Sequence, residues 1–142
     1  MDSLGGRMVS EAELFEWPVR VYQEDVDAGG IVYYANYLRF MERARSEWLR
    51  HLGLEQSALF EQSVMFVVRR CSVDYQAPGR LDDRLSVGVQ IVSSSRVQFD
   101  MEHRVVNQRD ERLATGTVTI ACLDASTKRP KRVPEAVYVW AQ

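Results

Sequence analysis

The sequence predicts an α+β domain in which one long helix packs against one mostly antiparallel sheet. Near the N-terminus, apolar and polar residues alternate with the period of a strand. Residues 34–52 then repeat apolar residues with the period of a helix, and the rest of the chain returns to the strand period. One apolar-faced helix among strands that follow one another directly is the pattern of an α+β domain.

Length and composition fit a single globular domain. The chain has 142 residues, of which 46% are hydrophobic and 27% charged, and no repeat or low-complexity tract divides it. We expect a flexible lead-in over residues 1–12 and one domain over residues 13–142. No signal peptide is apparent, and no apolar run approaches the roughly 20 residues that a membrane-spanning helix needs.

The net charge and the spacing of the cysteines argue against further classes of protein. A net charge of -2 argues against a general nucleic-acid-binding protein, which carries a basic surplus. Cys71 and Cys122 lie far apart in strand-like segments, without Cys-x-x-Cys spacing. We therefore expect a reduced, cytoplasmic protein in which both thiols are small core residues.

The first predicted strand lies within "LFEWPVRVYQE", residues 14–24. Its apolar residues alternate with polar ones and are Phe15, Trp17, Val19 and Val21. Pro18 interrupts this segment. Because proline has no N–H to donate to a neighbouring strand, we expect an edge position or a strand start here.

The long helix is predicted over residues 34–52, about five turns. One broad face of its helical projection is apolar, and the opposite face is mostly polar. The apolar face consists of Tyr37, Phe40, Met41, Ala44, Trp48, Leu49 and Leu52. Gly53 stands where a glycine commonly ends a helix, and a shorter helical segment is expected between Glu55 and Gln62.

Strands are expected from residue 64 to the end of the chain. Alternation runs through residues 64–79, 84–92, 96–106 and 112–124, with a polar turn at residues 107–111. The residues expected to point inward are Met65, Val67, Cys71, Val73, Tyr75, Leu85, Val87, Val89, Ile91, Val97, Phe99, Met101, His103 and Val105. With the N-terminal strand, these segments make a sheet of about five strands.

The segment "YQEDVDAGGIVYYANY", residues 22–37, resembles two kinds of ligand site without matching either. Asp25, Asp27 and Gly30 fall at the first, third and sixth positions of a calcium loop, as such loops require. Gly29, at the fifth position, has no ligand atom in its side chain, and Asn36 stands where the closing glutamate belongs. The glycines also lack the spacing of a dinucleotide or phosphate loop.

A third interpretation uses every part of this segment. A strand brings Asp27 to a glycine turn that lets the backbone approach a ligand, and a helix begins a few residues later. The first N–H groups of a helix are unpaired and partly positive, so they stabilise an oxyanion. A carboxylate beside them acts as a general base on water or as a nucleophile. The simpler alternative is that Asp25 or Asp27 only caps the helix.

Residues 19–53 resemble the signature of the 4-hydroxybenzoyl-CoA thioesterase-like branch of the hotdog-fold superfamily. The shared motifs are Tyr-x-Glu-Asp-x-Asp-x-x-Gly-x-Val-Tyr-x-x-x-Tyr and the Glu-Arg-Ala-Arg that follows in the helix. The segment looks most like the Tol–Pal-system-associated acyl-CoA thioesterases, and the strand order extends the resemblance over about residues 14–135. The resemblance implies a hotdog fold, in which a curved antiparallel sheet wraps around the long helix.

The resemblance also implies roles in the hydrolysis of acyl-CoA thioesters to free acid and CoA. Asp27 would be the catalytic carboxylate, the backbone N–H of Tyr34 would face the thioester oxygen, and Asp25 would be supporting. Gly30 and Val32 are expected to contact the substrate, and no cofactor is implied beyond the CoA of the substrate. Many Tol–Pal-associated members carry histidine in place of Tyr34, so the choice between aromatic and aliphatic acyl groups stays open.

Members of this family form dimers and often tetramers, so we expect a homodimer or homotetramer with active sites at the dimer interface. Acyl carrier protein is a second candidate for the acyl carrier. The expected location is the cytoplasm, with a peripheral position at the inner membrane as an option. The alternative function is a non-catalytic acyl-carrier or docking module of the envelope complex. A dehydratase fits less well, because neither His51 nor His103 lies in the motif, and the two histidines show no metal-ligand spacing.

Two further segments are candidates for contacts with CoA. In "SSSRVQF", residues 93–99, Ser94 and Ser95 offer hydroxyl or N–H groups and Arg96 offers a guanidinium that matches a phosphate; a plain hairpin turn is the alternative. The basic residues between 128 and 132 suit either the phosphorylated ADP end of CoA or an acidic carrier protein, and a solvated loop is equally consistent. Glu42 and Glu47, in the helix, are expected on a solvated or ion-paired face.

Overall fold

The computed structural model describes residues 14–141, whose elements follow the predicted order closely. The strands are β1 (Phe15–Arg20), β2 (Val64–Tyr75), β3 (Arg84–Ser94), β4 (Gln98–Val106) and β5 (Arg112–Asp124). The helices are α1 (Asn36–His51), α2 (Gln56–Glu61) and α3 (Glu135–Ala141), and a 3-10 turn, η2, covers Gln23–Asp25. The expected lead-in over residues 1–12 lies outside the described residues. No helix within the described range is both long and apolar enough to cross a membrane.

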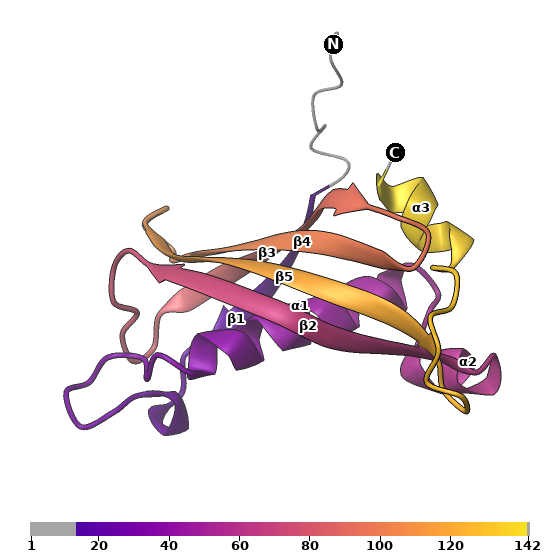
Figure 1. Ribbon diagram of the computed structural model, residues 1–142. Coiled ribbons are helices and arrows are strands. Elements are labelled where there is room, and N and C mark those ends of the chain that lie inside the picture. The colour runs from indigo at the N-terminus through magenta and orange to yellow at the C-terminus, as the bar shows by residue number, and fades with distance from the viewer. Residues whose placement is uncertain (1–13, 142) are drawn as a thin grey trace, which may run out of the picture.

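The five strands form one antiparallel sheet in the order β1-β3-β4-β5-β2, which confirms the predicted α+β hotdog architecture. The sheet curves around α1, as Figure 1 shows. β1 lies at one edge, in agreement with the prediction drawn from Pro18. β2 forms the other edge, so one side of its backbone has no strand partner among residues 14–141.

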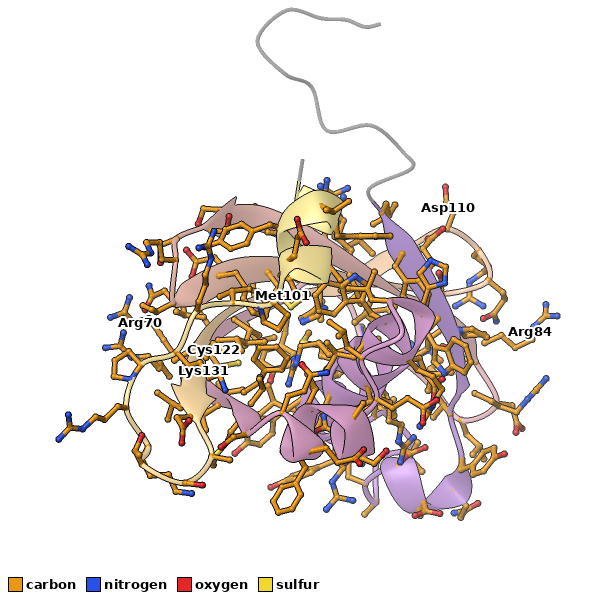
Figure 2. The ribbon with its side chains drawn as sticks, turned by 90° about the vertical axis from the view of Figure 1, so that its right-hand side faces the viewer. Arg70, Arg84, Met101, Asp110, Cys122 and Lys131 are labelled. Atoms are coloured by element: carbon orange, nitrogen blue, oxygen red, sulfur yellow. The ribbon has the colours of Figure 1, made fainter. Side chains whose placement is uncertain are left out.

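The C-terminal helix α3 contradicts the expectation of strands to the end of the chain. Pro134, just before it, is a favourable residue at a helix start, but seven residues are too few for a clear helical period. The helix is held instead by tertiary contacts at the end of the sheet seen in Figure 2. The Trp140 ring packs edge-on against Trp48 with centroids 6.3 Å apart, and the Tyr138 hydroxyl donates to the Ser95 carbonyl at 2.5 Å.

A β-bulge between Val68 and Arg70 changes which residues of β2 face inward. Val64 is buried and Phe66 packs edge-on against Phe99, so the inward residues before the bulge are one position away from those expected from the alternation that begins at Met65. The alternation in β2 therefore predicts the inward-facing residues only if the segments before and after the bulge are considered separately.

The two cysteines differ in environment. Cys122 is buried in β5, as predicted, but Cys71 is exposed, so the expectation of two core thiols is wrong for Cys71. Cys71 follows the bulge on the edge strand, where no neighbouring strand covers its outer side.

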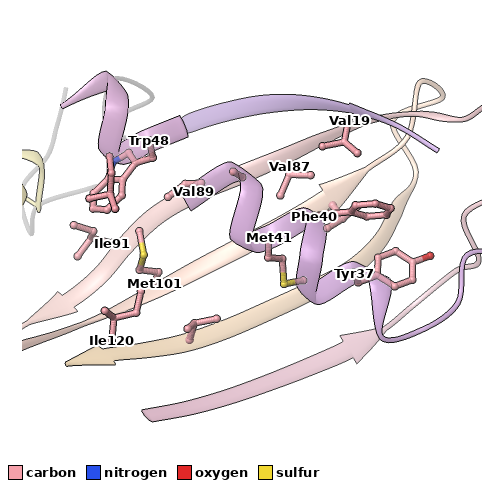
Figure 3. Packing of buried hydrophobic residues seen from close by; sticks show 14 of the residues in the cluster. Val19, Tyr37, Phe40, Met41, Trp48, Val87, Val89, Ile91, Met101 and Ile120 are labelled. Carbon is pink, nitrogen blue, oxygen red and sulfur yellow. The ribbon is translucent and has the colours of Figure 1, made fainter. Parts of the chain in front are cut away.

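Helix α1 lies in the concave side of the sheet with its predicted apolar face buried. The buried residues of the helix are Tyr37, Phe40, Met41, Ala44, Trp48 and Leu49. Figure 3 shows Met41 pointing from the helix into this core. Gly116 of β5 allows that contact, since a Cβ atom at this position would lie 2.6 Å from the Met41 sulfur.

Gly53 ends α1 as the sequence predicts. It has φ 79°, a conformation that favours glycine. Its N–H donates to the Arg50 carbonyl at 3.0 Å, and the N–H of Leu54 donates to the Leu49 carbonyl at 2.8 Å, which is the Schellman arrangement. The helix therefore stops after His51 and turns the chain toward α2.

His103 is fully buried in β4 and is hydrogen-bonded at both ring nitrogens, which confirms a packed histidine. Nδ1 lies 3.0 Å from the Gly88 carbonyl, and Nε2 lies 3.1 Å from Arg45 Nη1. Because a carbonyl only accepts and an arginine only donates, Nδ1 carries the proton and the ring is neutral. Burial, and then the charge of Arg45, lower the pKa of His103 to about 4.

We expect Gly116→Ala to lower the free energy of unfolding by about 1–3 kcal/mol, because the added methyl group overpacks the contact with Met41. Gly88→Ala is the matched control in β3, where the new Cβ would meet no atom closer than 3.4 Å. Denaturant unfolding of the two variants checks this, and equal stabilities would contradict it.

We also expect the free energy of unfolding to fall by about 3 kcal/mol as pH drops from 6.5 to about 4 through His103 alone. In that window the unfolded chain binds a proton that native His103 does not, so acid favours unfolding. His103→Gln keeps an acceptor for Arg45 and a donor for Gly88 but does not titrate. The unfolding free energy of this variant should therefore depend less on pH in the same window. An unchanged pH dependence would refute the assignment of the effect to His103.

Candidate active site

The loop between β1 and α1 is built on Asp25, which is only 6% exposed. Its Oδ2 accepts the N–H of Tyr22 at 2.8 Å. Its carbonyl accepts the N–H of Tyr33 at 2.9 Å and the side-chain amide of Asn36 at 3.0 Å. Asp25 therefore joins the two ends of the loop and the first turn of α1, a supporting position.

Asp27, two residues later, lies in an exposed turn. Its carbonyl accepts the N–H of Gly30 at 3.0 Å, and its N–H donates to the Ile31 carbonyl at 2.9 Å. Gly30 has φ 80°, so the turn requires a residue that tolerates the left-handed region. Oδ1 of Asp27 accepts the N–H of Gly29 at 2.8 Å. Oδ2 makes no hydrogen bond within residues 14–141, so one oxygen is oriented and the other is available.

Val32 anchors the far side of this turn to the rest of the domain. Its N–H donates to the Gly79 carbonyl at 2.9 Å, and it pairs with Val26 across the loop. Its side chain is 4% exposed and belongs to the core. The expected substrate contact is therefore not available to the Val32 side chain in the single chain, because the loop's outer surface is formed by residues 27–30.

Helix α1 begins with free amides. The helix starts at Asn36, two residues later than predicted, and Tyr34 and Ala35 form the turn before it. No hydrogen bond within residues 14–141 has the N–H of Tyr34 or Ala35 as its donor. These amides and the helix dipole favour negative charge at this position. The Tyr34 side chain is 63% exposed, so only its backbone is fixed here.

Tyr75, at the end of β2, holds the helix start in place, a role that the sequence did not reveal. Its hydroxyl donates to the Tyr34 carbonyl at 3.0 Å, and its ring packs edge-on against Tyr34 and Tyr37. The Tyr37 hydroxyl in turn accepts the N–H of Gly79 at 2.9 Å, and burial raises the pKa of Tyr37. Only the folded topology brings Tyr75 of β2 to Tyr34 and Tyr37 at the start of α1.

Ser94, Ser95 and Arg96 lie at the opposite end of the sheet from Asp27. The loop leaves β1 beside Arg84, at the start of β3, and β3 runs from there to Ser94, roughly 30 Å away at 3.3 Å per residue. The structure does not bring the predicted CoA contacts and the predicted catalytic residues together within one chain. The backbone carbonyls of Ser95 and Arg96 hold the C-terminal segment instead, through Tyr138 and Val133.

The other charged candidates are mostly engaged in structural contacts. Lys131 Nζ donates to the Gln62 carbonyl at 2.7 Å and lies on the same side of the molecule as Arg70 in Figure 2. Glu47 pairs with Arg50 at 2.6 Å, as predicted for a helix surface. Arg129 and Arg132 remain exposed. Within residues 14–141, no three metal-ligating side chains gather at one place.

The chain is similar to known proteins over most of its length. A family model described as the thioesterase-like superfamily matches residues 21–141. The acyl-CoA thioester hydrolase YbgC of Escherichia coli O6:H1 is 44% identical over 124 residues, which cover 87% of this chain and 92% of that protein. A 1,4-dihydroxy-2-naphthoyl-CoA hydrolase of Synechococcus elongatus is 29% identical over 120 residues, covering 83% of this chain and 88% of that one.

Solved structures share the fold. A probable thioesterase from Bartonella henselae has a TM-score of 0.79 and 33% identity, covering 85% of this chain and 99% of that chain. A 1,4-dihydroxy-2-naphthoyl-CoA thioesterase from Synechocystis has a TM-score of 0.83 and 22% identity, covering 90% and 95% of the two chains. At 22% identity, the similarity to the Synechocystis structure shows only that the fold is shared.

We expect Asp25→Ala to lower the free energy of unfolding by about 1–3 kcal/mol, since it leaves the N–H of Tyr22 without its acceptor. Asp74→Ala, at an exposed position of β2, is the control and should change stability little. Thermal and denaturant unfolding measure both. Equal effects of the two substitutions would show that Asp25 does not anchor the loop.

Proposed function

The chain belongs to the thioesterase-like superfamily and is an acyl-CoA thioester hydrolase, and we propose that Asp27 and the backbone N–H of Tyr34 carry out its reaction. The observation that supports these roles is their placement on one short loop. Asp27 leaves one carboxylate oxygen without a partner among the described residues, and the Tyr34 amide is a free donor at the start of α1.

The Tyr34 amide stabilises the negative charge that develops on the thioester oxygen. As the carbonyl carbon becomes tetrahedral, its oxygen gains charge, and a donor aligned with the helix dipole favours that charge more than it favours the neutral carbonyl. In the general-base route, Asp27 takes a proton from water while the water oxygen forms a bond to the carbonyl carbon. The intermediate then collapses, the carbon–sulfur bond breaks, and CoA leaves as a thiolate.

A nucleophilic route uses the same geometry. An Asp27 oxygen attacks the carbonyl carbon and displaces the CoA thiolate, which gives an acyl–aspartyl anhydride that water then hydrolyses. Because the thiolate is a stable anion, neither route needs a strong acid beside the sulfur. Gly29 serves both routes, since its N–H fixes one oxygen of Asp27 and leaves the other to react.

The proposed active site is completed by a second copy of the chain. Apolar side chains are exposed along the unpaired edge of the sheet and the neighbouring face of α1: Tyr34, Leu38, Val68 and Tyr75. An exposed edge strand with apolar neighbours favours pairing with another chain. A homodimer, alone or within a homotetramer, would cover this strip, and the second copy would supply Ser94, Ser95 and Arg96 for CoA.

The resemblance to Tol–Pal-system-associated thioesterases extends the proposal to the setting of the enzyme. We place it in the cytoplasm, at or near the inner membrane, with acyl-CoA or acyl carrier protein as the donor of the acyl group. The exposed Arg129 and Arg132 suit a phosphorylated or acidic carrier.

We expect Asp27→Asn to lower kcat for acyl-CoA hydrolysis at least about 100-fold, because the amide neither takes up a proton nor attacks the carbonyl carbon. Release of free thiol from a panel of short, long and aromatic acyl-CoA esters measures this. Glu24→Gln, an exposed neutralisation in the same loop, is the control and should retain activity. An Asp27→Asn enzyme that is folded and fully active would sink the proposed mechanism.

A further inference from the structure

A groove runs between α1 and β2 on the open side of the molecule. Two cavities of about 150 and 300 Å³ lie next to each other in it, and Glu42, Arg45 and Val68 border both. We call this the α1–β2 groove; it extends from Leu38 to Leu49 along the helix, and Cys71 lies on its strand side.

Arg45 is the unusual residue of the groove. Its side chain is half-buried, yet no carboxylate within residues 14–141 lies within 4 Å of its guanidinium nitrogens. Its one hydrogen bond among these residues goes to the neutral ring of His103. An arginine has five N–H donors, and a buried positive charge without a negative partner is costly. Glu42, one turn earlier, is exposed at the border of the groove; its charge offsets only part of the burial that lowers the pKa of Arg45.

The cavity of about 150 Å³ is lined mostly by apolar side chains, with Ser46 and Gln56 as further polar residues. Phe66, Phe99 and Ile120 line it together with Trp48. The indole N–H of Trp48 is buried, so it is not accessible from the cavity. A mostly apolar cavity bordered by the spare donors of Arg45 fits a ligand that is mostly apolar and carries an oxygen acceptor.

The groove leads to the proposed active site. Leu38, at its near end, follows Tyr34 by four residues, about 6 Å along the helix axis. On the strand side, β2 continues from Cys71 to Tyr75, whose hydroxyl binds the Tyr34 carbonyl. Arg45 lies about 16 Å beyond Tyr34 along the axis, and helical side chains lean back toward the N-terminus. An acyl group that extends from the Tyr34 amide along the groove would therefore approach the guanidinium.

We propose that Arg45 selects, among the acyl groups that lie in the α1–β2 groove, those with a hydroxyl or carboxylate oxygen remote from the thioester. The inference rests on the proposed function, because it takes the Tyr34 amide as the position of the thioester carbonyl. It assigns a role to the last arginine of the Glu-Arg-Ala-Arg motif, which the proposed chemistry does not use.

The test compares kcat/KM for matched substrates that differ by one remote oxygen group: 4-hydroxybenzoyl-CoA with benzoyl-CoA, and adipoyl-CoA with hexanoyl-CoA. In the wild type, we expect the oxygen-bearing member of at least one pair to be preferred roughly 10- to 100-fold, the effect of one hydrogen bond to a charged group. In Arg45→Met the ratio should fall to about one. Arg50→Met, on the exposed side of the same helix, should keep it.

Further measurements separate the remaining outcomes. If Arg45→Met does not fold, Arg45→Lys, which keeps the charge but not the planar donors, should still reduce the ratio. A wild type without preference, or an unchanged ratio in a folded Arg45 variant, overturns the proposal. An unchanged ratio with a dimer lost by light scattering would assign Arg45 to a contact between copies. Binding of non-hydrolysable thioether analogues to Asp27→Asn tests the groove even if Asp27 proves not to be catalytic.

Discussion

The close contact between Met41 of α1 and the backbone of β5 at Gly116 is the constraint on which the rest of the structure depends. A helix this deep in a curved sheet has little freedom to slide or turn, because interiors are packed to the density of crystals. Its first turn is therefore fixed at the end of the sheet where Tyr75 and Gly79 lie. The position of the Tyr34 amide is a consequence of core packing and not only of the loop that precedes it.

Environment, rather than residue type, separates the two aspartates of the loop. Asp25 is buried, and both its carboxylate and its carbonyl are hydrogen-bonded to the chain on either side of it. Asp27 is exposed and oriented through one oxygen by Gly29. A loop held by its first carboxylate can present the second in a fixed direction without burying it. The cost of ordering the loop is thus met by contacts that take no part in the chemistry.

Sequence periodicity predicted most of the fold because the buried faces of α1, β3 and β4 are set by local alternation within each element. It failed where contacts between distant segments determine the local structure. The bulge after Val68 shifts the face of β2, and α3 depends on contacts such as Tyr138 to Ser95 that join distant segments. The aspartate loop could be predicted as a unit because its parts are neighbours in sequence. The distance between that loop and residues 94–96 could not be predicted, because it depends on the direction of β3.

Solvent sets a further condition on the proposed chemistry. Two unit charges 4 Å apart attract each other by about 1 kcal/mol in bulk water and by about 4 kcal/mol at an effective dielectric constant near 20. The Tyr34 amide and Asp27 lie on the outside of the single chain, where water weakens their electrostatic interactions. Covering them need not change their geometry, which the core and Asp25 already fix. A surface that excludes water would strengthen the electrostatic interactions of the proposed catalytic groups.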